Sequence, residues 1–187
     1  DDTLNGEFGN DLVDGGAGID TIYGEQGLDT LNGGPQDDII FGGTENDTIN
    51  GNDGLDRIYG GSGNDSISGG NDNDLVFGEE GNDTIRGDAG LDELHGGIGN
   101  DTIYGGDQND TIYGEGDDDY AEGNAGTDTI YGGAGQDFLI GGGSTVGSDG
   151  NAGDFIYGES GNDIILGDDG ARGSIILIGG AGADTLS

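Results

Sequence analysis

The sequence contains no cysteine, and only three Lys and Arg residues stand against 40 Asp and Glu in a chain of 187 residues. The lack of cysteine excludes disulfide bonds and thiolate metal sites. The formal net charge of -37 makes nucleic acid and anionic membrane surfaces unfavourable partners and favours cations. No apolar run approaches the length of a membrane span, so we expect no membrane insertion, and residues 1–30 show no secretory signal.

Residues that carry chemistry are also scarce. There is one histidine, no cysteine and no Gly-x-Ser-x-Gly motif, so the sequence shows no catalytic set of residues. His95 is better explained as part of a structural stack than as a catalyst or ligand. We therefore expect that this chain is not an enzyme.

Apolar side chains are few, at 29% of the residues. Taken alone, this content and the acidic charge are typical of a disordered segment, because too little apolar surface is buried to offset chain entropy. A compact structure therefore requires something that neutralises the carboxylates.

A nine-residue repeat runs through the chain, as in the rows IDTIYGEQG from Ile19 and LDRIYGGSG from Leu55. In each row the second residue is Asp, the fourth is Leu, Ile or Val, and the sixth is Gly, with Ala121 the one weak entry in the fourth column. Three fixed columns over so many rows indicate a repeat architecture.

Each repeat predicts one short strand and one turn. The glycines permit the backbone conformations of a tight turn, and the three residues after Asp form a strand whose central aliphatic side chain points inward. Two repeats then make one coil of 18 residues, and each strand pairs in parallel with the strand one coil later. The predicted fold is an all-β, right-handed parallel β-roll, a solenoid with two sheets of short strands around a thin aliphatic core.

The turns match a known pattern at GGAGID (Gly15–Asp20), GGSGND (Gly60–Asp65) and GGAGQD (Gly132–Asp137). These rows resemble the GGxGxDxUx nonapeptide of the RTX family, the calcium-binding parallel β-roll proteins of bacterial type I secretion. The resemblance covers residues 1–140 continuously and returns at 153–170. We expect one roll over 1–187, with an inserted loop at 141–153 and an irregular last coil and terminal half repeat at 171–187, where Ile175 replaces the Asp of the repeat.

The resemblance implies that each Ca²⁺ lies between two turns stacked on one edge of the roll, bound by backbone carbonyls and by the Asp of each turn. Roughly 13 to 15 ions would be held in this way. The expected carboxylate ligands are Asp11, Asp20, Asp29, Asp38, Asp47, Asp56, Asp65, Asp74, Asp83, Asp92, Asp101, Asp110, Asp119, Asp128, Asp137, Asp154 and Asp163. The expected first-position carbonyl donors are Gly15, Gly24, Gly33, Gly42, Gly51, Gly60, Gly69, Gly78, Gly87, Gly96, Gly105, Gly114, Gly123 and Gly132.

Two features leave alternatives open. The aspartates could instead only cap their turns by accepting hydrogen bonds from backbone amides. Some turns carry a larger residue in place of the fourth-position glycine, which keeps the carbonyl but strains the turn; these are Gln36, Glu45, Asp72, Gln108 and Asp117.

One sheet is expected to carry a ladder of aromatic side chains on its outer face, at Tyr23, Phe41, Tyr59, Phe77, His95, Tyr113 and Tyr131. Stacked rings could simply support neighbouring strands. They could also form a contact surface for another roll, a neighbouring domain or a carbohydrate chain.

The leading functional hypothesis is a calcium-binding structural module of a secreted or cell-surface bacterial protein, which folds on extracellular Ca²⁺. One form of this hypothesis is a fibre or adhesin segment that associates with its own kind end to end or face to face. The alternative is the calcium-binding tail of a secreted protease, lipase or polysaccharide-modifying enzyme whose catalytic domain lies outside this chain.

Overall fold

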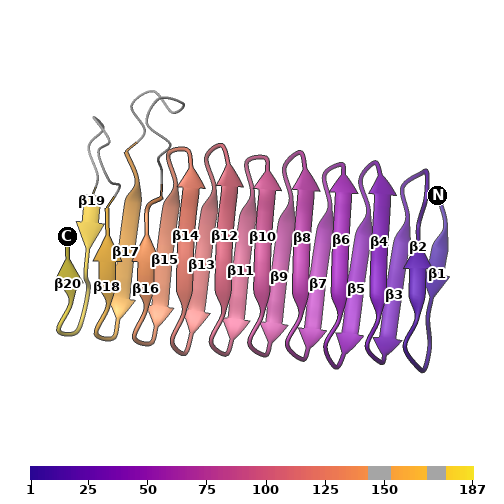
Figure 1. The fold of residues 1–187 in the computed structure, drawn as a ribbon, viewed down its shortest axis with the longest axis horizontal. Helices are drawn as coiled ribbons and strands as arrows, with labels where there is room; N and C mark the ends of the chain where they lie inside the picture. The colour runs from indigo at the N-terminus through magenta and orange to yellow at the C-terminus, as the bar shows by residue number, and fades with distance from the viewer. Residues whose placement is uncertain (143–152, 168–175) are drawn as a thin grey trace.

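The computed structural model describes residues 1–142, 153–167 and 176–187. The chain runs back and forth between two ten-stranded sheets, so that odd-numbered strands form one sheet and even-numbered strands the other (Figure 1). Every strand pair is parallel, and regular partners lie 18 residues apart, as in Ile40 with Ile58. The predicted all-β parallel solenoid of two sheets is therefore confirmed.

The strands of the first sheet are β1 (Thr3–Asn5), β3 (Thr21–Gln26), β5 (Ile39–Thr44), β7 (Arg57–Ser62), β9 (Leu75–Glu80), β11 (Glu93–Ile98), β13 (Thr111–Gly116), β15 (Thr129–Ala134), β17 (Phe155–Ser160) and β19 (Ile176–Ile178). The strands of the second sheet are β2 (Leu12–Asp14), β4 (Thr30–Pro35), β6 (Thr48–Asp53), β8 (Ser66–Asn71), β10 (Thr84–Ala89), β12 (Thr102–Asp107), β14 (Tyr120–Ala125), β16 (Phe138–Ile140), β18 (Ile164–Leu166) and β20 (Thr185–Leu186).

The register continues across the two places where the sequence repeat breaks. Ile130 pairs with Ile156, and Ile156 pairs with Leu177, so the core column is kept although the spacing along the chain is longer. The proposed loop at 141–153 lies mostly outside the described residues, and so does Ile175. Its neighbour Ile176 pairs with Phe155, the residue that follows Asp154.

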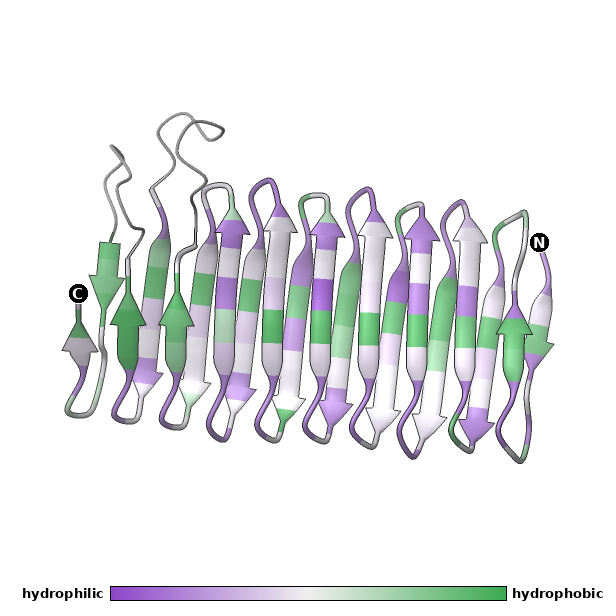
Figure 2. Cartoon of the chain, in the orientation of Figure 1, coloured by the Kyte–Doolittle hydropathy of each residue, from purple (hydrophilic) through white to green (hydrophobic). Residues whose placement is uncertain are grey.

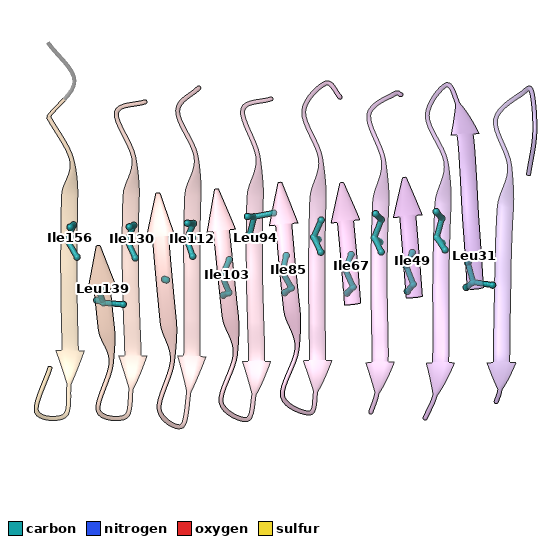
Figure 3. Close-up of a cluster of buried hydrophobic side chains, with 14 of the residues drawn as sticks. Leu31, Ile49, Ile67, Ile85, Leu94, Ile103, Ile112, Ile130, Leu139 and Ile156 are labelled. Carbon is teal, nitrogen blue, oxygen red and sulfur yellow. The ribbon is translucent and has the colours of Figure 1, made fainter. Parts of the chain in front are cut away.

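The core is one aliphatic side chain thick. Each long strand buries its second residue, which belongs to the fourth column of the repeat, and its fourth residue, which is a glycine; Ile85 and Gly87 of β10 are an example. The aliphatic residues of the two sheets meet between the layers (Figure 3). Ala121 is fully buried, as its column predicts. Such a core gives each coil only two substantial apolar side chains.

Outward positions are mostly polar along the roll and become hydrophobic in its last coils, where β16, β18 and β19 are apolar along their length (Figure 2). Ile164, Ile176 and Ile178 are among the exposed residues of this region. Within the part of the chain that the structure describes, no helix is long and apolar enough to cross a membrane.

Truncation of a core residue tests the fold. We expect Ile85→Ala to lower the free energy of unfolding by about 2 to 5 kcal/mol, because the deleted atoms leave a cavity in a core that is one side chain thick. Ile98→Ala is the control, since Ile98 is 64% exposed. Chemical unfolding at saturating Ca²⁺ measures both, and equal losses would contradict the proposed core.

Candidate metal sites

The turns form two edges of the roll. Edge I consists of the turns that join an odd strand to the next even strand, at the bottom of Figure 1, and edge II consists of the turns that join an even strand to the next odd strand, at the top. Each complete turn begins with the buried glycine of one strand and ends with the Asp that precedes the next strand. The nonapeptide thus places one Asp at each end of every long strand.

The aspartates of each edge stack into a column. In both columns Oδ1 of one Asp accepts a hydrogen bond from the backbone N–H of the Asp one coil earlier, as in Asp65 N–H to Asp83 Oδ1 at 2.8 Å. The edge I column is Asp11, Asp29, Asp47, Asp65, Asp83, Asp101, Asp119, Asp137, Asp163 and Asp184. The edge II column is Asp2, Asp20, Asp38, Asp56, Asp74, Asp92, Asp110, Asp128 and Asp154.

All the aspartates that the repeat predicts as ligands therefore lie in these two columns, including Asp154 and Asp163 beyond the first break. The columns also contain Asp2 and Asp184, which the expected ligand set lacked. The signal for Asp184 was present in the sequence, because GGAGAD at Gly179–Asp184 is a full match to the turn pattern. Their role as metal ligands stays a prediction.

In most column residues the second carboxylate oxygen is left without a partner. Oδ2 is buried and accepts no hydrogen bond in Asp11, Asp20, Asp29, Asp38, Asp47, Asp56, Asp65, Asp74, Asp83, Asp92, Asp101, Asp110, Asp119, Asp128, Asp137 and Asp163. Buried polar atoms in native proteins almost always have a partner, and an unpaired carboxylate oxygen is the costliest exception. The alternative in which Asp only caps the turn accounts for Oδ1 and leaves Oδ2 unexplained.

The first glycine of each turn gives these oxygens their space. A Cβ placed on Gly60 would lie 2.6 Å from Asp65 Oδ2 and 2.7 Å from the carbonyl oxygen of Gly78, the first glycine of the next turn on the edge. Gly24 shows the same arrangement, with Asp29 Oδ2 at 2.6 Å and the Gly42 carbonyl oxygen at 2.4 Å. A carboxylate oxygen and a carbonyl oxygen from adjacent coils thus converge where only glycine leaves room.

This donor set fits calcium. Ca²⁺ takes carboxylate and backbone carbonyl oxygens in flexible geometry, whereas softer metals favour nitrogen and sulfur ligands. In the described ranges, no group of three or more His, Cys, Asp or Glu side chains converges on one point. Each ion would therefore be held by the Asp carboxylates of two successive turns together with their glycine carbonyls.

In the absence of a cation, burial raises the pKa of thirteen column carboxyl groups, those of Asp38, Asp47, Asp56, Asp65, Asp74, Asp83, Asp92, Asp101, Asp110, Asp119, Asp128, Asp137 and Asp163. The pKa is raised to about 8 in Asp74, Asp110 and Asp119, first by loss of hydration and then by the charges of the Asp residues one coil away. The hydrogen bond from the backbone N–H opposes this shift in each case. These carboxyl groups therefore favour protonation, or the binding of another positive charge, over remaining as bare anions.

The turns contain many non-glycine residues in the left-handed region. The five expected at the fourth position, including Gln36 and Asp117, have φ values of 71° to 90°, which confirms the strain predicted there. A second group occupies the second turn position, which the sequence interpretation did not consider: Glu7, Glu25, Asn52, Glu79, Asp88, Glu115, Asn124 and Glu159. Such conformations persist only where the surrounding structure holds them.

The aromatic ladder forms as expected and gains Tyr157 at its far end. Successive rings from Tyr23 to Tyr157 lie 4.6 to 5.2 Å apart between centroids, with interplanar angles of 4° to 21°. His95 is part of the stack, and its two ring nitrogens lie 2.9 Å from Glu115 Oε1 and 3.1 Å from Glu93 Oε1. Because each ring face within the stack is covered by the next ring, the geometry favours strand support over the stacking of sugars on ring faces.

Comparison with known proteins agrees with this geometry. The family model described as the RTX calcium-binding nonapeptide repeat matches residues 1–22, 14–49, 32–67, 50–85, 86–121, 113–145, 146–171 and 176–187. A search of curated proteins finds no match. Among solved structures, the chain is similar to a hyperactive, Ca²⁺-dependent, β-helical antifreeze protein from an Antarctic bacterium, with 18% identity, a TM-score of 0.45, and coverage of 96% of this chain and 80% of that one. That likeness is distant.

The raised pKa values predict how acid acts on the metal-free chain. A carboxyl group with a raised pKa in the folded state stabilises that state when protonated, so its contribution is full below the ordinary value of 3.8 and is lost as the pH rises through about 6 to 8. We therefore expect acidification from pH 8 to pH 4 in chelator to increase β structure, measured by circular dichroism.

Because protonation of these carboxyl groups stabilises the same folded state, the Ca²⁺ concentration needed for half-maximal folding should fall as the pH is lowered from 8 to 6 at constant ionic strength. A Ca²⁺ midpoint that does not change over this interval would contradict the raised pKa values of the columns.

Proposed function

Because the chain belongs to the RTX calcium-binding nonapeptide repeat family, we propose that it is a structural module whose folding is coupled to calcium binding in its two aspartate columns. The observation that carries this proposal is the row of buried, unpartnered Asp Oδ2 atoms along both edges. The repeats span nearly the whole chain and no catalytic domain is evident in it, which supports a structural role for the module.

Each candidate site is built by two stacked turns. For the pair Asp65 and Asp83, the residues that would hold the ion are the two carboxylates and the carbonyls of their turns, including that of Gly78. When bound, Ca²⁺ supplies the positive charge that the buried carboxylates lack. Within the described residues, stacked pairs number nine on edge I and eight on edge II, which is somewhat more than the thirteen to fifteen sites expected from the repeat alone.

The net charge of -37 makes folding depend on cations. Without cations the stacked carboxylates repel one another across each coil, and one aliphatic side chain per strand is too little to hold the coils together. At low calcium the chain is disordered, and at extracellular calcium sites with dissociation constants of about 10⁻⁴ to 10⁻³ M suffice. RTX repeats are typical of type I secreted proteins, so we place this module in a secreted or cell-surface protein.

Two settings are compatible with this role. In the first, the roll is a spacer in an adhesin or fibre; in the second, it is the calcium-binding tail of a secreted enzyme. The repeats extend through the chain and are the same in both settings, so the neighbouring sequence of the full gene product distinguishes them. The stacked rings of Tyr23 to Tyr157 act in either case as support for the first sheet.

Calcium-dependent folding is the direct test. We expect a disordered circular dichroism spectrum in chelator and a cooperative gain of β structure with millimolar Ca²⁺, because each ion links neighbouring coils. Mg²⁺ should substitute poorly, since it demands tighter octahedral geometry. A complete β spectrum at neutral pH in excess chelator would refute the coupling.

A single-atom change tests the column assignment. Asp74→Asn keeps an oxygen to accept the hydrogen bond from Asp56 N–H but removes the charge and the unpartnered Oδ2, in a residue shared by two stacked pairs. We expect a higher Ca²⁺ midpoint and a lower cooperativity. Asp53→Asn is the matched control, because Asp53 is an exposed turn residue of edge II with the same charge. Equal shifts in the two variants would contradict the columns.

A further inference from the structure

A second ladder of side chains runs beside the aspartate columns. It is formed by the fifth turn residue, which directly precedes the column Asp. On edge I Leu28 interrupts this ladder near its start, donating its backbone N–H to Asn10 but offering no side-chain oxygen. From Asn46 onward the side-chain oxygen of this residue accepts a hydrogen bond from the backbone N–H of the fifth residue one coil later. The bonds from Asn64, Asn82, Asn100, Asp118 and Gln136 N–H to the side chains of Asn46, Asn64, Asn82, Asn100 and Asp118 measure 2.8 to 3.3 Å.

On edge II the same ladder is interrupted at every second coil. Asp37 and Asn73 accept from the backbone N–H of Leu55 and Leu91. A leucine has no oxygen to offer in return, and among the described residues the backbone N–H of Asn73 and of Asn109 finds no hydrogen-bond partner. Leu55 and Leu91 are 54% and 51% exposed, so core packing does not account for them.

The two edges therefore hold their calcium turns differently. On edge I the backbone N–H of Asn64 is hydrogen-bonded to a side chain of the preceding coil, and the backbone N–H of Asp65 is hydrogen-bonded to a side chain of the following coil. At Asn73 and Asp74 on edge II, only the Asp amide is tied. A turn with both amides fixed has less backbone freedom to lose when it closes around a ligand, and preorganisation of this kind raises affinity without adding a contact to the ligand.

We propose that the fifth-position residues Asn46, Asn64, Asn82 and Asn100 are positioning residues, which make edge I bind calcium at lower concentration than edge II. The inference rests on the proposed function, because it assumes that the aspartate columns are the calcium sites. Its effect acts through the backbone of the turn, since these side chains bond to amides of the next coil.

The tyrosines provide a readout for one edge. Of the seven in the chain, Tyr23, Tyr59, Tyr113, Tyr131 and Tyr157 each directly precede the first glycine of an edge I turn. Tyr120 directly follows Asp119 of the same edge, and only Tyr104 precedes an edge II turn. Terbium, which takes the same oxygen ligands as calcium, should therefore give tyrosine-sensitised luminescence mainly from edge I, while equilibrium dialysis counts ions on both edges.

The chain offers matched variants that exchange the two kinds of residue. Asn64→Leu with Asn82→Leu breaks the ladder on edge I, and Leu55→Asn with Leu91→Asn completes it on edge II, with no change of charge in either. We expect the first pair to raise the luminescence midpoint by about 3- to 10-fold, the effect of losing hydrogen bonds of ordinary strength. The second pair should leave the luminescence midpoint unchanged and lower the midpoint of total binding. The four changes together conserve composition and should reverse the order in which the edges fill.

In the unmodified chain, luminescence should reach half-saturation at a lower terbium concentration than total binding. Coincident curves, or a luminescence midpoint that Asn64→Leu with Asn82→Leu leaves in place, would overturn the inference while calcium-dependent folding stands. If the second pair moved the luminescence midpoint as far as the first, the effect would be one of general stability and the inference would again fail. Absence of any calcium-dependent folding in the unmodified chain would instead refute the proposed function itself.

Discussion

The stacking of like charges inside the roll constrains everything else in the structure. Column aspartates such as Asp56 and Asp74 are 1% and 3% exposed, and each has a carboxylate of the same charge one coil away on either side. In each of these two residues a backbone amide donates a hydrogen bond to Oδ1, and within the described ranges no group of the protein donates one to Oδ2. The free energy of this arrangement is unfavourable unless a positive charge enters, so folding and cation binding are one equilibrium.

The glycine column follows from that constraint. The first glycine of a turn does not have the positive φ that would by itself require glycine. Glycine is needed there for space, since a Cβ on Gly78 would lie 2.4 Å from Asp83 Oδ2 and 2.5 Å from the carbonyl oxygen of Gly96. The missing side chain is the space in which the oxygens of two coils converge. Glycine at this position therefore serves the metal site more than the turn, and an alanine there would fill the site.

Much of the structure was predictable because the repeat has one phase. Once Asp and the aliphatic residue are assigned to columns, the strands, the core and the stacking of Tyr23 on Phe41 follow from the 18-residue coil. Asp184 was missed as a column member because the two breaks in the repeat shift its phase, although its turn GGAGAD matches the pattern; the register of Ile165 with Leu186 places it on edge I. The different fates of Oδ1 and Oδ2 could not be predicted, since they depend on which coil each oxygen faces.

On edge II leucine recurs at the fifth turn position with a period of 36 residues, at Leu55 and Leu91, and this sequence period is also a structural period. One coil before Leu55 and Leu91, the same turn position holds Asp37 and Asn73. Along edge II, turns whose fifth side chain accepts a hydrogen bond therefore alternate with turns whose fifth side chain has no acceptor. A solenoid is coupled chiefly between neighbouring coils, and its cooperativity depends on the weakest of those links. On edge II every second pair of coils lacks the side-chain-to-amide hydrogen bond that joins each pair of coils on edge I from Asn46 to Gln136. By this bonding pattern edge II repeats over a two-coil unit, whereas edge I repeats with every coil from Asn46 to Gln136.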